Sequence, residues 1–144
     1  MLMKVENIIH IDAPKSTVWA ITEDVEHWPD WLKTIESVTR IEEGPFKKGS
    51  AAMIKQLGLP EAKWIVTAMT YGEMFTWETR FPGITMVATH ELKTTETGTL
   101  NLLRIEVSGI AALLLWLLIR FPLGWALGRE NVSLKAKCEG FDLS

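Results

Sequence analysis

Near its C-terminus the chain carries a long apolar run, and any fold for this sequence has to place it. From Gly109 to Gly128 the residues read GIAALLLWLLIRFPLGWALG, a stretch about as long as a membrane-spanning helix. Arg120 and Pro122 interrupt the run, and an Arg near the centre of a bilayer costs on the order of 2.5 to 3.5 kcal/mol. We therefore expect a buried helix of a soluble domain, with peripheral membrane contact as the alternative.

The helical pattern continues from this run to about Gly140. One face of the expected helix carries residues at steps of three and four, namely Trp116, Ile119, Leu123, Leu127, Asn131, Leu134 and Cys138. Pro122 removes one backbone hydrogen bond, which predicts a kink. We expect the apolar half before Pro122 to be buried against the sheet, and the amphipathic half after it to lie across the fold.

The length and charge of the chain exclude several classes of protein. With 144 residues we expect one domain, residues 1–144, and 47% hydrophobic residues supply an ample core. The net charge of -3 comes from scattered residues without a basic cluster, so nucleic acid is not an expected partner. One cysteine and three isolated histidines predict neither an internal disulfide nor a metal site, and without a secretory signal we expect a cytoplasmic location.

Alternating and helical patterns predict the order of the elements. Lys4 to Ile11 alternates as a strand, and Asp12 followed by Pro14 predicts the start of a helix with Asp12 as its cap. A second short helix is expected from Pro29. Six strand-like stretches separated by turn residues follow and predict an antiparallel meander: SVTRIEEG, GSAAMIKQ, EAKWIVTAMT, MFTWETRF, ITMVATHELKT and TLNLLRIEVSG.

Several segments carry a resemblance to a known superfamily. The opening IDAPKSTVWAITEDVEHWPDWLKTI, the strand segments FTWETRF and THEL, and the hairpin segment GTLNLLRIEVSG resemble the START-like helix-grip (SRPBCC) superfamily. This superfamily includes the Bet v 1 allergens and the polyketide cyclase/dehydrase family. The resemblance implies an α+β fold, with a seven-stranded curved antiparallel sheet around a long C-terminal helix and two short helices after the first strand. It also implies a cavity for a small hydrophobic ligand, such as a lipid, a polyketide or an isoprenoid-like molecule, but no single reaction.

Period-two alternation indicates which strand side chains face such a cavity. On the last strand, Leu103 belongs to an apolar set that alternates with Arg104 and Glu106, and Asn101 lies on the same face as Leu103. Two strands earlier, Trp77 alternates with Glu78 and Arg80. His90, on the strand between them, is the best inward titratable group. We expect it to be either a core histidine bonded to a neighbouring carbonyl or hydroxyl, or a polar contact or general acid/base facing the ligand.

Further candidates come from strands with mixed faces and from the long helix. Trp64 and Met53 are weaker strand candidates, because both faces of their strands are mixed. On the helix, four residues are spaced to reach the cavity or its mouth: Leu113, Trp116, Leu117 and Arg120. Arg120 is expected either to bind an acidic head group at the rim or to be an ordinary surface arginine.

The motifs of common enzyme classes are missing from the sequence. It contains no Gly-x-Ser-x-Gly, His-Glu-x-x-His, Walker or Gly-x-Gly-x-x-Gly motif, so we expect no cofactor. We favour a binding or carrier protein that holds an apolar molecule by shape, oriented by His90 and Asn101. Two alternatives stay open: a polyketide cyclase or dehydratase in which His90 moves a proton, and a lipid or quinone chaperone whose LLLWLLI segment docks on a membrane or a partner. The edge strands and the apolar helix also leave room for a homodimer.

Overall fold

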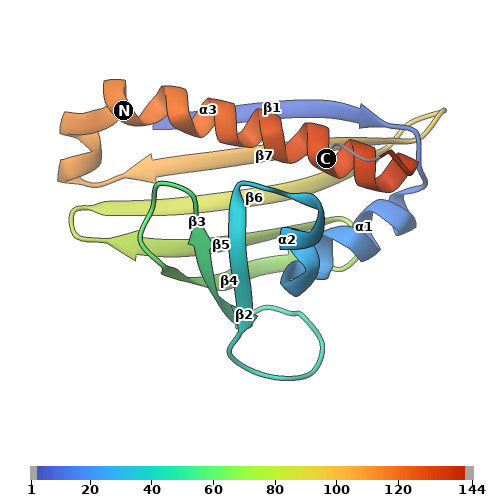
Figure 1. Ribbon diagram of the computed structural model, residues 1–144, viewed down its shortest axis with the longest axis horizontal. Coiled ribbons are helices and arrows are strands. Elements are labelled where there is room, and N and C mark those ends of the chain that lie inside the picture. Colours follow the sequence, from blue (N-terminus) through green and yellow to red (C-terminus); the bar gives the residue numbers. More distant parts are fainter. Residues whose placement is uncertain (1–2, 142–144) are drawn as a thin grey trace.

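Seven antiparallel strands form one curved sheet, and the long helix α3 (Ile110–Glu139) runs along it (Figure 1). The computed structural model describes residues 3–141. The strands lie in the order β1-β7-β6-β5-β4-β3-β2, so β1 pairs with the last strand and the others pair with their neighbours in the chain. Their bounds are β1 (Met3–Ile11), β2 (Ile35–Arg40), β3 (Ala51–Gln56), β4 (Ala62–Thr70), β5 (Met74–Phe81), β6 (Ile84–Thr94) and β7 (Thr99–Ser108). The predicted meander and the predicted α+β helix-grip fold are confirmed.

Between β1 at one edge of the sheet and β2 at the other, the chain forms three short helical segments. These are α1 (Lys15–Glu23), the 3-10 turn η1 (Val25–His27) and α2 (Trp28–Trp31). The predicted cap of α1 is wrong. Pro14 occupies the N-cap position with an extended backbone and no side-chain hydrogen bond, and the Asp12 carboxylate instead lies 3.3 Å from His10 Nδ1.

One face of the sheet is mainly apolar and aromatic and forms the core. On β5, β6 and β7 the buried side chains are those that alternation predicts, among them Phe75, Trp77, Met86, Ala88, His90, Leu92, Asn101, Leu103 and Val107. Aromatic rings meet edge-on here: the centroid of Trp77 lies 5.5 Å from that of Trp28 and 5.3 Å from that of Phe75. Ring packing therefore joins α2 to the middle of the sheet.

Two glycines allow the backbone to approach other segments closely. A Cβ on Gly98 would lie 2.2 Å from Ile11 O, and a Cβ on Gly109 would lie 2.2 Å from Gly83 O. Gly109 also has a φ of 110°, which side chains with a Cβ rarely adopt. The Gly83 carbonyl accepts a hydrogen bond from Ala111 N at 3.0 Å, so the turn between β5 and β6 holds the first turn of α3.

A buried asparagine network fastens the second half of α3 to the sheet. Asn131 Oδ1 accepts a hydrogen bond from Asn101 Nδ2 on β7 at 2.6 Å. Asn131 Nδ2 donates to the backbone and side-chain oxygens of Asn7 on β1, at 3.0 and 2.7 Å. Asn101 and Asn131 are both fully buried, so one side chain ties the helix to both strands.

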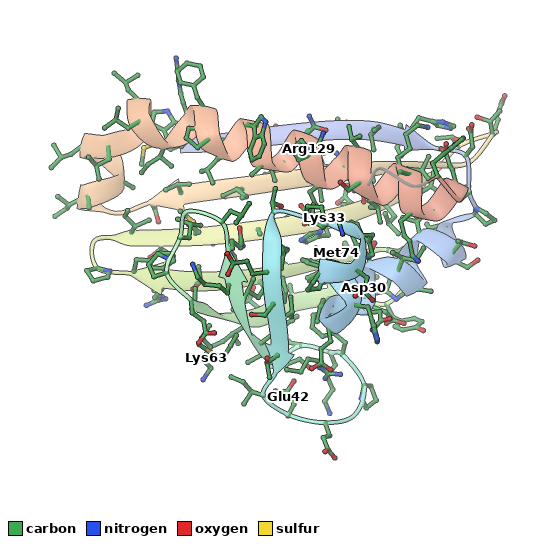
Figure 2. All side chains as sticks on the ribbon, viewed as in Figure 1. Asp30, Lys33, Glu42, Lys63, Met74 and Arg129 are labelled. Atoms are coloured by element: carbon green, nitrogen blue, oxygen red, sulfur yellow. The ribbon has the colours of Figure 1, made fainter. Side chains whose placement is uncertain are left out.

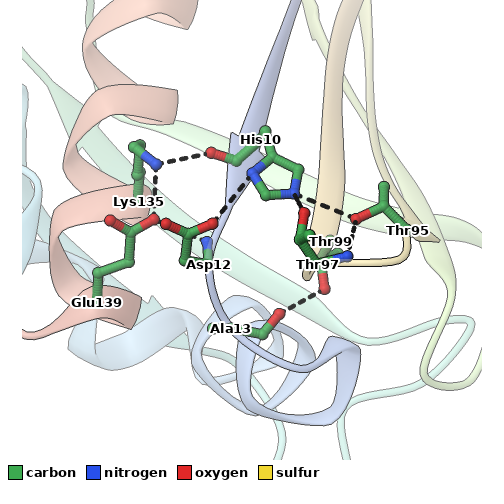
Figure 3. Close-up of polar contacts among 8 residues, drawn as sticks. All are labelled: His10, Asp12, Ala13, Thr95, Thr97, Thr99, Lys135 and Glu139. Carbon is green, nitrogen blue, oxygen red and sulfur yellow. Dashed lines mark hydrogen bonds and ion pairs between the residues drawn. The ribbon is translucent and has the colours of Figure 1, made fainter.

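A second polar cluster joins the last turns of α3 to the end of β1 and the turn after β6 (Figure 3). Lys135 Nζ donates to His10 O at 2.9 Å and lies 2.6 Å from Glu139 Oε2, which also accepts from Asp12 N at 2.8 Å. The His10 ring lies 3.0 Å from Thr97 Oγ1. The hydrogen bond from Lys135, followed by that from Asp12 N, lowers the pKa of the Glu139 carboxyl.

The first half of α3 is exposed, and the prediction that it would be buried is wrong. The most apolar 18 residues of this helix have a mean hydropathy of 2.0, but only 11% of them are buried. The reason is that α3 packs mainly against β1 and β7, while rings from α2 and β5 fill the middle of the inner face. Figure 1 shows the helix changing direction near its start, and Figure 2 shows side chains of its first turns projecting away from the sheet. By length and composition alone, α3 is apolar enough to cross a membrane.

Candidate functional site

A cavity of about 60 Å³ lies between the inner face of the sheet, α2 and the middle of α3. Its walls are aromatic and aliphatic, with rings from α2, β4 and β5 and side chains from β7 and α3, including Trp28, Trp64, Trp77, Leu103, Leu123 and Leu127. Three titratable residues line it: His90 and Glu130, and Arg104 of β7, whose guanidinium is paired with Glu6 on β1 at 3.0 Å. Apolar walls with few polar groups are typical of sites for small hydrophobic molecules.

The cavity is small for a ligand site, because aromatic rings fill most of the space. Sites for small molecules usually have volumes of roughly 300–1,000 Å³, whereas this cavity has room for a few water molecules. The centroid of Trp77 lies 5.7 Å from that of Trp64 and 5.5 Å from that of Trp28. A ligand larger than a few atoms therefore has to move side chains of the wall when it binds.

His90 is held on the inner face of β6 by aromatic rings. Its ring stacks on Phe75 with centroids 4.5 Å apart and planes 9° apart, and its centroid lies 5.4 Å from that of Trp28. The side chain is 6% exposed, and burial lowers its pKa to about 3. Among residues 3–141 it has no side-chain hydrogen bond, which contradicts the expected core histidine bonded to a carbonyl or hydroxyl. At neutral pH His90 is an uncharged imidazole next to the cavity.

Glu130 is the second titratable group of the cavity, and sequence reasoning missed it. It reaches the cavity from α3, and burial raises the pKa of its carboxyl to about 7. No ion pair or hydrogen bond joins this carboxyl to another of the described residues. The sequence held one signal: Glu130 follows Leu127 by three residues and precedes Leu134 by four, which places it on the buried face of the helix.

Below about pH 7 these two groups give the cavity an uncharged donor and an uncharged acceptor. Desolvation alone shifts each pKa, so neither group depends on a charge on the other. A protonated Glu130 can donate a hydrogen bond, and the neutral imidazole of His90 can donate from one nitrogen or accept at the other. The pair can therefore orient a polar group of a ligand or exchange protons with it.

The structure brings four of the predicted site residues together at the cavity: Trp64, Trp77, His90 and Leu103. Asn101 does not line it, because its amide is used in the network with Asn131. Met53 also points elsewhere: its neighbour Ile54, together with Gln56, lines the wall from β3. Whether the four residues contact a ligand stays a prediction.

The cavity contacts predicted for the first half of α3 are wrong in position, whereas the alternative expected for Arg120, an ordinary surface arginine, agrees with the structure. Leu113 and Leu117 are 58% and 70% exposed and lie outside the cavity wall, and Arg120 is exposed with its guanidinium 4.6 Å from the centre of the Phe121 ring. Trp116 is half-buried against the core but does not line the cavity. The helix approaches the cavity only one turn later, with Leu123 and the residues that follow.

The described part of the chain has no cluster that suits a metal. Among residues 3–141, no group of three or more His, Cys, Asp or Glu side chains lies close enough together to hold an ion. Cys138 is the one cysteine of the sequence, and burial raises the pKa of its thiol to about 11, so it is a poor nucleophile.

A curved antiparallel sheet whose aromatic inner face meets one long helix over a cavity defines the helix-grip class of proteins. Sequence comparison narrows the class: residues 3–139 match the family described as "Polyketide cyclase / dehydrase and lipid transport", and the chain belongs to this family. The resemblance predicted from the sequence is confirmed. No match was found among curated proteins.

Solved structures with this fold share little sequence with the chain. The di-domain ARO/CYC StfQ from the steffimycin biosynthetic pathway has a TM-score of 0.80 and 11% identity, over 97% of this chain and 51% of StfQ. This chain therefore spans about half the length of StfQ. The major latex-like protein 151 of Panax ginseng has a TM-score of 0.77 and 13% identity, over 95% and 97% of the two chains. Norcoclaurine synthase of Thalictrum flavum, solved with dopamine and hydroxybenzaldehyde, has a TM-score of 0.74 and 12% identity, over 100% and 90%. At such identities these structures establish the fold alone.

Proposed function

We propose that the protein binds a small, mostly apolar molecule with one uncharged polar end in the cavity between the sheet and α3. The observation that carries the proposal is the pair formed by His90 and Glu130. His90 is buried and Glu130 is half-buried, and both line an apolar cavity without a hydrogen-bond partner among the described residues, whereas buried polar side chains in native proteins are nearly always hydrogen-bonded. A ligand hydroxyl or carbonyl would supply the missing hydrogen bonds.

The surroundings of the two groups support an uncharged polar end. Ionised Glu130 would repel a carboxylate or phosphate, the low pKa of His90 provides no positive charge to offset it, and the guanidinium of Arg104 is already paired with Glu6. The aromatic rings favour a ligand with a flat or aliphatic body. The family description and the shared fold fit such binding. We propose that the ligand is a lipid, a polyketide or an isoprenoid-like molecule.

Fluorescence titration with N-phenyl-1-naphthylamine, an uncharged apolar dye, tests the proposal, with a fatty alcohol and the matching fatty acid as competitors. We expect one dye per chain, displaced better by the alcohol than by the acid above neutral pH. Replacing His90 or Glu130 by Leu should weaken binding of the alcohol by roughly fivefold, since each lost hydrogen bond contributes about 1 kcal/mol. Glu43→Gln on the exposed loop after β2 is the control. Absence of saturable dye binding by the folded protein would refute the proposal.

A second candidate function is a cyclase or dehydratase, favoured by the same pair of groups. An acid with a pKa of about 7 that lines the same cavity as an uncharged imidazole suits proton transfer at neutral pH. Turnover of a poly-β-ketone thioester, followed by mass spectrometry, tests this activity. His90→Gln and Glu130→Gln should then abolish turnover while dye binding is kept. Unchanged turnover in both variants would exclude the mechanism.

A further inference from the structure

We propose that the protein docks on an anionic lipid bilayer through the first half of α3, which lies in the plane of the interface. The docking surface, here called the apolar arc, consists of Ile110, Leu113, Leu114, Leu117, Leu118, Phe121 and Trp125. Each of these side chains is between 58% and 79% exposed. The proposal rests on this surface and does not depend on what the cavity binds.

The apolar arc forms one continuous face of the helix. Counted at about 100° per residue, its seven members fall within roughly 140° of the helix circumference. Ala112 and Trp116, on the opposite side, pack against the core of the domain. Large contiguous apolar patches on a folded surface mark sites of membrane or protein contact.

The charges around the apolar arc favour a membrane with anionic lipids as the occupant. Between Glu106 and Glu130 the sequence has no acidic residue, whereas Arg120 and Arg129 are exposed and form no ion pair within residues 3–141. A protein partner would normally supply carboxylates opposite such arginines, but anionic head groups supply the same charge. Trp125 adds an exposed ring of the kind that is enriched at membrane interfaces.

The tethers of α3 show why this segment lies on a bilayer and does not span it. Its first turn is bonded to the Gly83 carbonyl, and its second half is fastened to the sheet through Asn131. Both ends of the apolar half therefore stay with the same folded domain. The stretch from Ile110 to Trp125 is also only about 24 Å long as a helix, shorter than the roughly 30 Å hydrocarbon core.

Docking in this orientation would bring a wall of the cavity close to the lipids. Leu123 and Leu127 line the cavity and stand two residues before and two residues after Trp125, on the other side of the same helix. If the proposed ligand binding is correct, this placement gives an apolar ligand a short path from the bilayer. The docking experiment below needs no ligand, so failure of either proposal can be recognised separately.

Flotation with vesicles of phosphatidylcholine, with or without phosphatidylglycerol, tests the docking. We expect the protein to float with the mixed vesicles and to bind less as salt is added. The triple variant Leu114→Gln, Leu118→Gln, Phe121→Gln should lower the partition coefficient on the order of 100-fold, because three apolar side chains no longer insert. For the double variant Arg120→Gln, Arg129→Gln the partition coefficient should fall about 30-fold on the mixed vesicles and change little on phosphatidylcholine alone.

A matched control uses exposed apolar residues away from α3. Ile8, Ile41 and Leu57 are 62%, 53% and 55% exposed, and their replacement by Gln should leave flotation unchanged. Circular dichroism establishes that each variant is folded. The proposal is overturned if the wild-type protein does not float, or if the control loses as much binding as the triple variant. It is equally overturned if sedimentation finds that the wild-type protein is a dimer and the triple variant a monomer, and if neither protein binds vesicles.

Discussion

Replacing Glu130 by Gln tests whether the cavity is an apolar environment. Gln has nearly the shape of a protonated Glu and cannot ionise. The wild-type carboxyl has an ordinary pKa of 4.5 when the chain is unfolded and a pKa of about 7 in the folded protein, because burial disfavours its charge. Since the folded pKa is the higher one, the folded state holds the proton longer, and stability falls as pH rises between these two values.

The size of the effect follows from these two pKa values. The wild-type protein should lose about 0.8 kcal/mol of its free energy of unfolding at pH 5, and about 3 kcal/mol at pH 7 and above, relative to a state with a neutral carboxyl. Glu130→Gln lacks this loss. Its advantage over the wild-type protein should therefore grow by about 2.5 kcal/mol between about pH 5 and about pH 8.5.

Urea denaturation at a series of pH values, followed by circular dichroism, measures this difference. Glu43→Gln, which removes the same charge from an exposed loop, is the matched control and should follow the wild-type profile. Parallel profiles for Glu130→Gln and the wild-type protein would refute the reasoning. They would mean that the carboxyl is solvated and that the cavity wall at α3 is open to water.

Three further changes test how α3 and the sheet are held together. Asn131→Ala removes the link between the helix and two strands and leaves its buried partners without hydrogen bonds. Urea denaturation should therefore show a free energy of unfolding lower by roughly 2–4 kcal/mol. Gly98→Ala places a Cβ against Ile11 O, and calorimetry should find a melting temperature lower by several degrees, about 2–4 °C for each 1 kcal/mol lost in a domain near this size. Lys135→Met removes the donor that lowers the pKa of Glu139. The variant should be fully destabilised at pH values above the ordinary carboxyl pKa, and the destabilisation should shrink as pH falls through the lowered pKa of Glu139. A loss of stability that does not depend on pH would contradict this prediction.

The strand faces could be predicted because alternation decides them locally. On β6 and β7, charged side chains occupy one face and apolar ones the other, so His90 and Leu103 could be placed inward from the sequence. The same logic failed on β3, where Met53 and Ile54 are both apolar and alternation gives no preference. Asn101 was correctly placed inward, but its role depends on Asn131, which is distant in the chain and reaches it only in the fold.

By itself, the sequence determined the order of the elements, the family and the buried face of the second half of α3, because periodicity and turn residues act over short distances. Only the tertiary structure decided that the first half of α3 is exposed, that Glu130 faces the cavity and that rings reduce this cavity to about 60 Å³. Hydropathy shows that a segment avoids water but does not say what covers it. That depends on which surfaces the rest of the fold leaves free: here rings from α2 fill the inner face, and the apolar half of α3 is left for another partner, which we propose is a bilayer.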